Sequence, residues 1–369
     1  MKALLDYVST VADIRQEKKV LHKMMDIIMI VFFAMLSNAD DWVEMEVFAR
    51  EHEDFLRNYL ELPNGIPSHD TIQRVFAIVP PEFLEDFQRR WNEMLNSGEG
   101  DKIKRLLAID GKTQRGNSSK NQKANHIVSA VDEKGFCLGQ KRVDEKTNEI
   151  KAIPELLDCL NIKGTIITTD AMGTQTAIVR KIQQKRADYV LALKANQGNL
   201  FEDVRLYFSD MGHLQRSAYK KTTEKARGKI ERREYWQTDD ISWLSQKKEW
   251  RGLKTIILTR NTVTGQGGEV SVEERYFISS LPSGIEEIAR AVRGHWMVES
   301  YHWHLDVTFR EDGNHTLEKQ ASYNLNIMRK LSLNILKLME VGSKPLSLKK
   351  KRFAIGTNPE KHLEQIMNL

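Results

Sequence analysis

The spacing of hydrophobic residues changes along this chain. Up to about residue 100, apolar side chains recur at intervals of three and four, as in Phe83, Phe87 and Trp91, a spacing typical of helices that bury one face. The most apolar segment, Met24 to Leu36, is shorter than the roughly 20 residues that cross a bilayer, and it contains Asp26. We therefore predict a buried helix there and no membrane segment.

A short helix is predicted after the turn that begins at Pro63. Ser68 is a suitable N-cap for it, and polar residues such as Thr71 and Arg74 follow in its first turns. The segment 64–76 could enter a DNA groove as a helix-turn-helix does. A capped packing helix explains the same pattern. The sequence NSGEGD at 96–101 predicts a linker.

From residue 103 onward, short apolar runs replace the helical spacing. The runs at 106–109, 126–131, 136–143, 165–169 and 189–193 predict strands, with amphipathic helices after the third and the fourth. This order predicts an α/β fold with a ribonuclease-H-like mixed sheet flanked by helices.

The segment from about 200 to 275 interrupts this order. It is basic between 220 and 233 and then strand-rich, so we predict an insertion, followed by one long helix over 285–309 and a further helix over 323–339. The predicted organisation is an all-helical, DNA-binding region over 1–100, a catalytic domain over 101–342 and a basic C-terminal tail over 343–369.

Composition narrows the picture only modestly. Lys and Arg number 56 against 51 Asp and Glu, giving a net charge of +5 and a pI of about 8.9, which ordinary solubility explains as well as nucleic-acid binding. The two cysteines, Cys137 and Cys159, form no CxxC pair and encode neither a disulfide framework nor a cysteine-rich zinc site. With no secretion or anchoring signal visible, we expect a cytoplasmic protein.

Three acidic residues are the candidates for chemistry. Asp110 and Asp170 end the first and fourth predicted strands, and Glu299 lies in the long late helix. Phosphodiester cleavage by two divalent ions needs a few carboxylates of this kind. Each residue alone has an ordinary explanation, as a turn residue or a solvated helix residue. Five further residues share roughly one face of the Glu299 helix: His295, Trp296, His302, Trp303 and Asp306.

Two competing motifs fit poorly. Gly111-Lys112-Thr113 resembles the end of a phosphate-binding loop, but Leu106 occupies the position of its leading glycine. His295, Glu299 and His302 have spacings compatible with a helical zinc site, yet no HExxH motif is present.

Several longer motifs resemble one known family. They are AMLSNADDW (34–42), NGIPSHDTIQRVF (64–76), AIDGKTQRG (108–116), ITTDAMGTQ (167–175), LALKANQ (191–197), YFISSL (276–281) and RGHWMVESYHWHLDVTFRED (293–312). In this order, and over nearly the whole chain, they resemble bacterial insertion-sequence DDE transposases of the group that includes the H-repeat-associated proteins of Rhs elements.

The resemblance implies a function for the acidic residues. Asp110, Asp170 and Glu299 would bind Mg²⁺, with Mn²⁺ as a substitute. The enzyme would cleave transposon ends and transfer the 3′-hydroxyl to target DNA. The resemblance also implies a homodimer in the complex with double-stranded DNA and a nucleoid-associated, cytoplasmic location. Two alternatives stay open: a catalytically inactive DNA-binding remnant, and a general ribonuclease-H-fold nuclease.

The chain departs from the family pattern at two positions that grip DNA. Relatives carry an arginine four residues before the glutamate and a lysine seven residues after it, where this chain has His295 and Asp306. We expect Arg293 and Arg310 to replace them. The insertion also has Arg-Gly-Lys-Ile-Glu where the family often has His-Gly-Arg-Ile-Glu. The predicted DNA contacts are Lys112, Arg115, Arg227, Lys229, Arg232, Arg233, Arg293 and Arg310; a solvated basic face is the alternative for the insertion.

Overall fold

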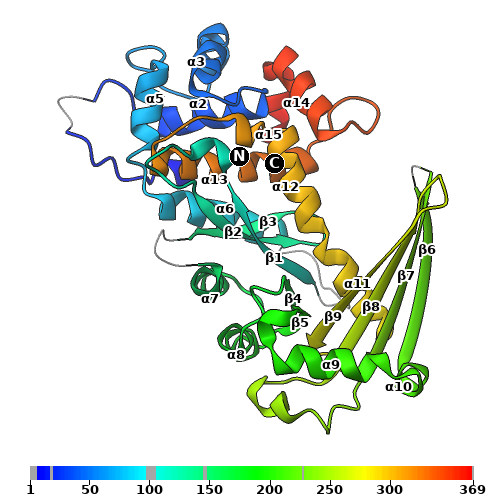
Figure 1. Ribbon diagram of the computed structural model, residues 1–369. Helices are drawn as coiled ribbons and strands as arrows, with labels where there is room; N and C mark the ends of the chain where they lie inside the picture. The colour runs from blue at the N-terminus through cyan, green and yellow to red at the C-terminus, as the bar shows by residue number, and fades with distance from the viewer. Residues whose placement is uncertain (1–5, 17–19, 97–104, 144–147, 227, 368–369) are drawn as a thin grey trace.

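The computed structural model describes residues 6–16, 20–96, 105–143, 148–226 and 228–367. Nine strands form one sheet in the order β3-β2-β1-β4-β5-β9-β8-β7-β6, with helices packed around it (Figure 1). The predicted fold class, a mixed sheet flanked by helices with a strand-rich insertion and an N-terminal helical region, is confirmed.

The first five strands follow the predicted order closely. They are β1 (Leu106–Thr113), β2 (His126–Asp132), β3 (Cys137–Arg142), β4 (Ile166–Thr169) and β5 (Asp188–Leu193). β1 pairs antiparallel with β2 and parallel with β4. Because Ile109 lies opposite Thr169 in that parallel pair, the next residues, Asp110 and Asp170, lie side by side. Asp170 directly follows β4, as predicted, but the prediction that Asp110 ends its strand is wrong, because β1 continues to Thr113 through its pairing with β2.

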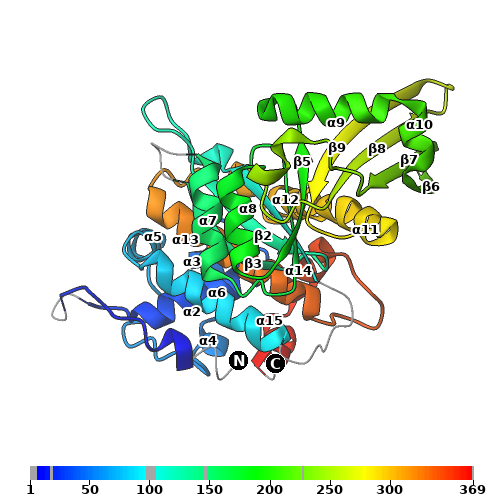
Figure 2. The same ribbon diagram turned by 90° about the horizontal axis from the view of Figure 1, so that it is seen from below.

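Alternation along the strands sends side chains to two cores. Leu107 and Ile167 pack beneath α7 (Glu149–Cys159) and α8 (Thr176–Gln184), which lie side by side against one face (Figure 2). Leu106 and Ile166 point to the other face, where they pack with the buried residues of α11 (Ile285–His295). Burial on both faces requires the nearly continuous apolar runs that these strands show.

The insertion continues the same sheet. It contains the helices α9 (Asn199–Ser209) and α10 (Met211–Arg216), followed by the strands β6 (Ala218–Ala226), β7 (Lys229–Thr238), β8 (Thr255–Thr264) and β9 (Val270–Ser279). β9 pairs antiparallel with β5, with Leu193 opposite Tyr276. The long strands extend away from the rest of the molecule, and the basic segment of the insertion lies on β6 and β7 at the edge of the sheet that is far from β5 (Figure 1).

The single long helix predicted over 285–309 is wrong. The segment forms α11 and α12 (Met297–Val307), which are separated at Trp296. A Cβ atom on Gly294 would overlap the Leu106 side chain of β1, so the backbone of α11 lies directly against the sheet at this point. The chain then begins a second helix, which carries Glu299.

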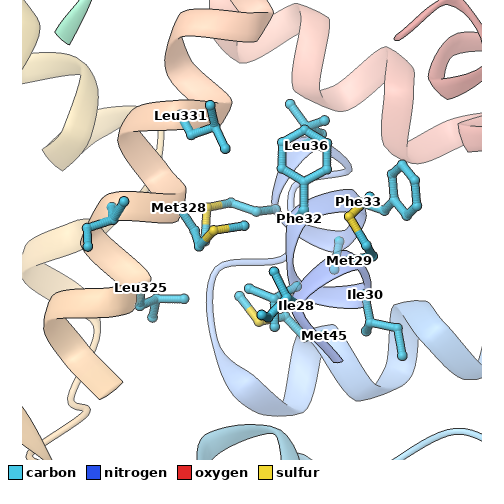
Figure 3. Close-up of a cluster of buried hydrophobic side chains, with 14 of the residues drawn as sticks. Ile28, Met29, Ile30, Phe32, Phe33, Leu36, Met45, Leu325, Met328 and Leu331 are labelled. Carbon is cyan, nitrogen blue, oxygen red and sulfur yellow. The ribbon is translucent and has the colours of Figure 1, made fainter. Parts of the chain in front are cut away.

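The N-terminal helices share their core with the C-terminal ones. They are α2 (Met24–Leu36), α3 (Trp42–Glu51), α4 (Glu53–Leu56), α5 (His69–Phe76) and α6 (Pro81–Asn96). Figure 3 shows Phe32 of α2 and Met45 of α3 in one cluster with Met328 of α13 (Lys319–Leu338). The predicted buried helix over 24–36 is confirmed. None of the described helices is both long and apolar enough to cross a membrane.

Two further elements match the predicted positions in part. Ser68 caps α5 by accepting a hydrogen bond from the backbone of Thr71, as predicted. The helix predicted over 323–339 is α13, which begins four residues earlier, at Lys319. Of the linker predicted over 96–101, residues 97–101 lie outside the described residues.

The basic C-terminal tail is not a free segment. Its residues form α14 (Leu348–Thr357) and α15 (Pro359–Met367), and Arg352, the last residue of a basic run that begins at Lys349, is fully buried. The Arg352 guanidinium donates to both carboxylate oxygens of Asp40, at 2.7 and 3.2 Å, and to the carbonyl of Met35. Lys351 donates to the carbonyls of Leu336 and Met339. Both cations hold the helices together.

We expect Arg352→Met to destabilise the fold strongly. Removing one partner of a buried ion pair leaves a buried charge without full compensation and costs about 3–5 kcal/mol. The free energy of unfolding, measured by urea denaturation and circular dichroism, reports this loss. Arg205→Ala is the control, because both side chains of the Arg205–Glu202 pair are exposed. Its removal should leave the urea concentration at the midpoint of unfolding unchanged. Equal midpoints for Arg352→Met and wild type would contradict the assignment.

Candidate active site

Asp110, Asp170 and Glu299 line a single cleft. Its volume is about 400 Å³, and it is open to solvent between the ends of β1, β4 and β5, the insertion strands and the start of α12. The predicted acidic residues thus line one cleft although they come from three separate segments of the chain.

The Asp170 carboxylate is oriented by the backbone that follows it. One of its oxygens accepts hydrogen bonds from the N–H groups of Met172 and Gly173, at 3.0 and 3.1 Å. Gly173 is needed in this turn, because a Cβ atom there would overlap the Thr169 side chain. The turn therefore fixes the direction in which Asp170 points.

Asp110 lies in a strongly acidic environment. Burial, followed by the nearby negative charges of Asp170, Glu149 and Glu299, raises its pKa to about 7. Carboxylates that repel one another in this way are stabilised by a bound cation. The arrangement at Asp110 therefore favours a small, charge-dense positive ion.

Two histidines beside the carboxylates are held neutral. Burial lowers the pKa of His302 to about 3 and that of His295 to about 4. The Nδ1 atom of His302 lies 3.6 Å from a carboxylate oxygen of Asp110, and Nδ1 of His295 lies 2.9 Å from the Thr168 hydroxyl. The buried Nε2 atom of His302 has no hydrogen-bond partner among the described residues. These rings add no positive charge that could compete with a cation.

Lys112 is held by carboxylates of the protein itself. Its Nζ atom lies 2.7 Å from Asp306, 3.0 Å from Glu311 and 3.3 Å from Asp312, and the side chain is only 11% exposed. Although burial alone would lower the pKa of Lys112, the charges of Glu311 and Asp306 raise it. We therefore assign Lys112 a structural role in place of the expected DNA contact. Asp306, which departs from the family pattern, is therefore neutralised by Lys112.

Arg310 also has partners inside the protein. Its guanidinium binds Asp40 at 2.7 Å and Glu44 at 2.8 Å, which fastens the end of α12 to the N-terminal helices. We assign it the same kind of structural role instead of the expected phosphate contact.

The other predicted DNA contacts differ in exposure. Arg293 lines the cleft, is about half exposed, and lies 4.0 Å from Glu224. Arg233 also lines the cleft but is paired with Glu224 at 3.1 Å and with Glu231. Arg232 lies 3.2 Å from Glu234, Lys229 is exposed, and Arg115 is 84% exposed. Arg227 lies outside the described residues.

Three further cations that were not predicted from the sequence also line the cleft. Lys194 follows β5 directly, and Arg260 and Arg275 come from β8 and β9. The Arg275 guanidinium lies 5.0 Å from the centre of the Trp296 ring, so it stacks on the residue that separates α11 from α12. The pairing of β5 with β9, and of β9 with β8, brings Arg275 and Arg260 to the cleft, whereas Lys194 lies at the end of β5 itself. No local pattern indicates the pairing of β5 with β9.

The remaining residues of the active-site helix take different environments. Trp296 lines the cleft, whereas Trp303, one turn beyond Glu299, is 55% exposed. An exposed tryptophan beside a candidate active site is available to a ligand's flat surface.

The donor chemistry of the cleft fits a hard divalent ion. Asp110, Asp170 and Glu299 offer carboxylate oxygens, the ligands that Mg²⁺ prefers. Among the residues that the structure describes, no three His, Cys, Asp or Glu side chains lie close enough to hold one ion as they stand. Exposed Glu299 would have to turn towards the two aspartates to complete such a site.

Comparison with known proteins connects this site to one family. Residues 101–335 match the family described as "Transposase DDE domain", and residues 5–92 match the one described as "DDE_Tnp_1-associated". The chain is 37% identical over 369 residues to the "H repeat-associated putative transposase YhhI" of Escherichia coli (strain K12), covering 97% of this chain and 96% of YhhI.

Two other relatives carry different descriptions. The "Putative transposase YncI" of Escherichia coli O157:H7 is 36% identical over 371 residues, covering 97% of this chain and 93% of YncI. The "Inactive transposase YbfQ" of Escherichia coli (strain K12) is 44% identical over 77 residues, covering 21% of this chain and 92% of YbfQ.

We expect Asp110→Asn to stabilise the fold at high pH. Between the unfolded pKa, near 3.9, and the folded pKa of about 7, the folded protein binds the extra proton. Its free energy of unfolding therefore falls as the pH rises through that window. In EDTA at pH 8, the free energy of unfolding of the variant should exceed that of wild type by on the order of 2–4 kcal/mol. Below about pH 4, the two proteins should have the same free energy of unfolding.

Urea denaturation at pH 4, 6 and 8 measures this effect, with Asp54→Asn, an exposed residue of α4, as the control. If Asp110→Asn and wild type unfold at the same urea concentration at pH 8, the carboxylates do not repel one another as their geometry implies.

Proposed function

This chain belongs to the DDE-domain transposases, and we propose that it cleaves phosphodiester bonds at the ends of a mobile DNA segment and transfers the freed 3′-hydroxyl to target DNA. The observation that carries the proposal is the convergence of Asp110, Asp170 and Glu299 on one cleft inside the matched domain.

The three carboxylates would hold divalent ions, Mg²⁺ or Mn²⁺. Bound there, two such ions would activate the attacking oxygen and stabilise the leaving oxygen. Asp170 is oriented by its backbone hydrogen bonds, so it would act as a fixed ligand. Asp110 would lose its proton as the ion binds, since its raised pKa comes from charges that a cation offsets. The neutral rings of His302 and His295 would lie beside the bound ions without adding positive charge.

Double-stranded DNA would approach along the rim of the cleft. Lys194, Arg275 and Arg293 line the same cleft as the acidic residues, and from there they would contact phosphates next to the scissile bond. Such contacts give affinity without reading bases. Base reading would fall to another element, and α5 remains the candidate. Because two ends must be joined in one reaction, we propose a homodimer in the DNA complex, associated with the nucleoid.

A catalytically inactive, DNA-binding remnant is the second candidate. It is motivated by His295 and Asp306, which replace residues that grip DNA in relatives, and by the relative that is named inactive. Both departures have local partners here: His295 binds Thr168 and Asp306 binds Lys112. These partners favour an intact site and therefore the active enzyme.

We expect Asp110→Asn and Glu299→Gln each to abolish metal-dependent cutting. Removing a group that acts mainly in the transition state lowers the rate by about 10³-fold or more. The assay is cleavage of labelled DNA carrying the element's own flanking sequence, with Mg²⁺, Mn²⁺ or EDTA. Glu340→Gln, an exposed residue beyond α13, should cut normally. Tight binding without cutting by wild type under either metal would favour the remnant, and cutting that ignores the ends would favour a general nuclease.

We expect Arg293→Gln and Lys194→Gln to weaken DNA binding similarly for all sequences. Each lost phosphate contact should also reduce the slope of log affinity against log salt by about 1. Fluorescence anisotropy between 50 and 300 mM salt measures both quantities. Arg205→Gln is the matched control, because Arg205 is exposed but paired with Glu202 on α9. An unchanged slope in both test variants would remove the rim from the DNA-binding surface.

A further inference from the structure

A fourth carboxylate, that of Glu149, lies against β1 at the residue after Asp110, where it lines a neighbouring cavity together with His126. Glu149 is the first residue of α7, and its side chain is 12% exposed. It faces the backbone of β1 at Gly111, the residue that directly follows Asp110. Neither the family motifs nor the proposed reaction uses this residue.

His126 holds the Glu149 carboxylate in place. The Nε2 atom of His126 lies 2.5 Å from a carboxylate oxygen of Glu149, and its Nδ1 atom lies 2.8 Å from the Thr113 hydroxyl. Thr113 and His126 are opposite each other in the pairing of β1 with β2. The restraint is therefore built from β1, β2 and α7 together, and the carboxylate has one defined position.

The absence of a side chain at position 111 makes room for Glu149. A Cβ atom on Gly111 would overlap the Glu149 carboxylate and the Nε2 atom of His126. Gly111 does not have a positive φ, so its backbone does not require glycine. The requirement comes from the close approach of the carboxylate to the strand.

We propose that Glu149, held by His126 and admitted by Gly111, is a fourth ligand of the metal centre formed by Asp110, Asp170 and Glu299. This inference rests on the proposed function. The carboxylate would bind the ion next to Asp110 directly or through one of the waters that Mg²⁺ retains.

A purely structural role explains only part of this arrangement. An acidic residue in the first turn of a helix is stabilised by the helix dipole, and this accounts for a glutamate at the start of α7. It does not account for bringing that carboxylate against β1 beside Asp110. Carboxylates held against the same stretch of strand repel one another unless a cation lies between them. A shared cation would offset the repulsion.

Binding of Mn²⁺ to the full chain tests the proposal without any measurement of activity. Free Mn²⁺ is counted by electron paramagnetic resonance during titration of wild type, Glu149→Gln, Gly111→Ala and Asp110→Asn. Glu149→Gln keeps the shape and a hydrogen bond to His126, and Gly111→Ala should displace the carboxylate without changing it. We expect both to weaken Mn²⁺ binding by about tenfold or more. Near-ultraviolet circular dichroism in EDTA verifies that each variant is folded.

Glu155→Gln is the matched control, since Glu155 lies on the same helix and is exposed. It should bind Mn²⁺ as wild type does. If Asp110→Asn weakens binding and Glu149→Gln does not, the fourth ligand is refuted while the proposed metal centre stands. If neither substitution changes Mn²⁺ binding, the proposed centre is wrong and Glu149 has no role as a ligand.

Discussion

A buried ionic network ties the N-terminal helices to the catalytic sheet. Asp40, between α2 and α3, binds Arg352 of α14, and its carbonyl accepts a hydrogen bond from Arg329 of α13 at 3.3 Å. Arg329 lies 3.8 Å from Glu311, which binds Lys112 of β1. Burying these charges costs several kcal/mol each unless all the partners are present. The helical region and the sheet therefore depend on one another, and α12 is anchored at its far end by the same network.

Local pattern predicts the elements of this fold better than their long-range pairing. The five strands from β1 to β5 have apolar runs that are buried on both faces, and each was predicted within a few residues. The pairing of β9 with β5 was not predicted, because Leu193 and Tyr276 are far apart in sequence and nothing near either residue specifies the other. The break at Trp296 was also missed, and it lies beside a close approach of Gly294 to Leu106 of β1 that the local sequence does not indicate.

The same division applies to the site. Asp110 and Asp170 could be placed together because each directly follows the apolar run of a predicted strand, and those strands are parallel neighbours. Glu299 was chosen as the acidic residue of the predicted late helix, where local pattern does not distinguish it from a solvated residue, and the resemblance to a family supported the choice. The ion pairs of Lys112 could not be foreseen, since its partners lie about 200 residues away along the chain. Glu149 gave no signal beyond that of an acid at a helix start. The position of its carboxylate against β1 depends on the absence of a side chain at Gly111.

The separation of charges in the cleft follows from where Lys112 is held. Lys112 lies two residues after Asp110, so its side chain leaves the same face of β1 and could have neutralised that aspartate. Lys112 is paired instead with Asp306, Glu311 and Asp312. The pKa of Asp110 is therefore raised mainly by burial and by other carboxylates. The cations Lys194 and Arg293 line the same cleft. A centre without its own cation beside a positively charged rim can take up a metal ion and a polyanion together, as transfer of a DNA strand requires.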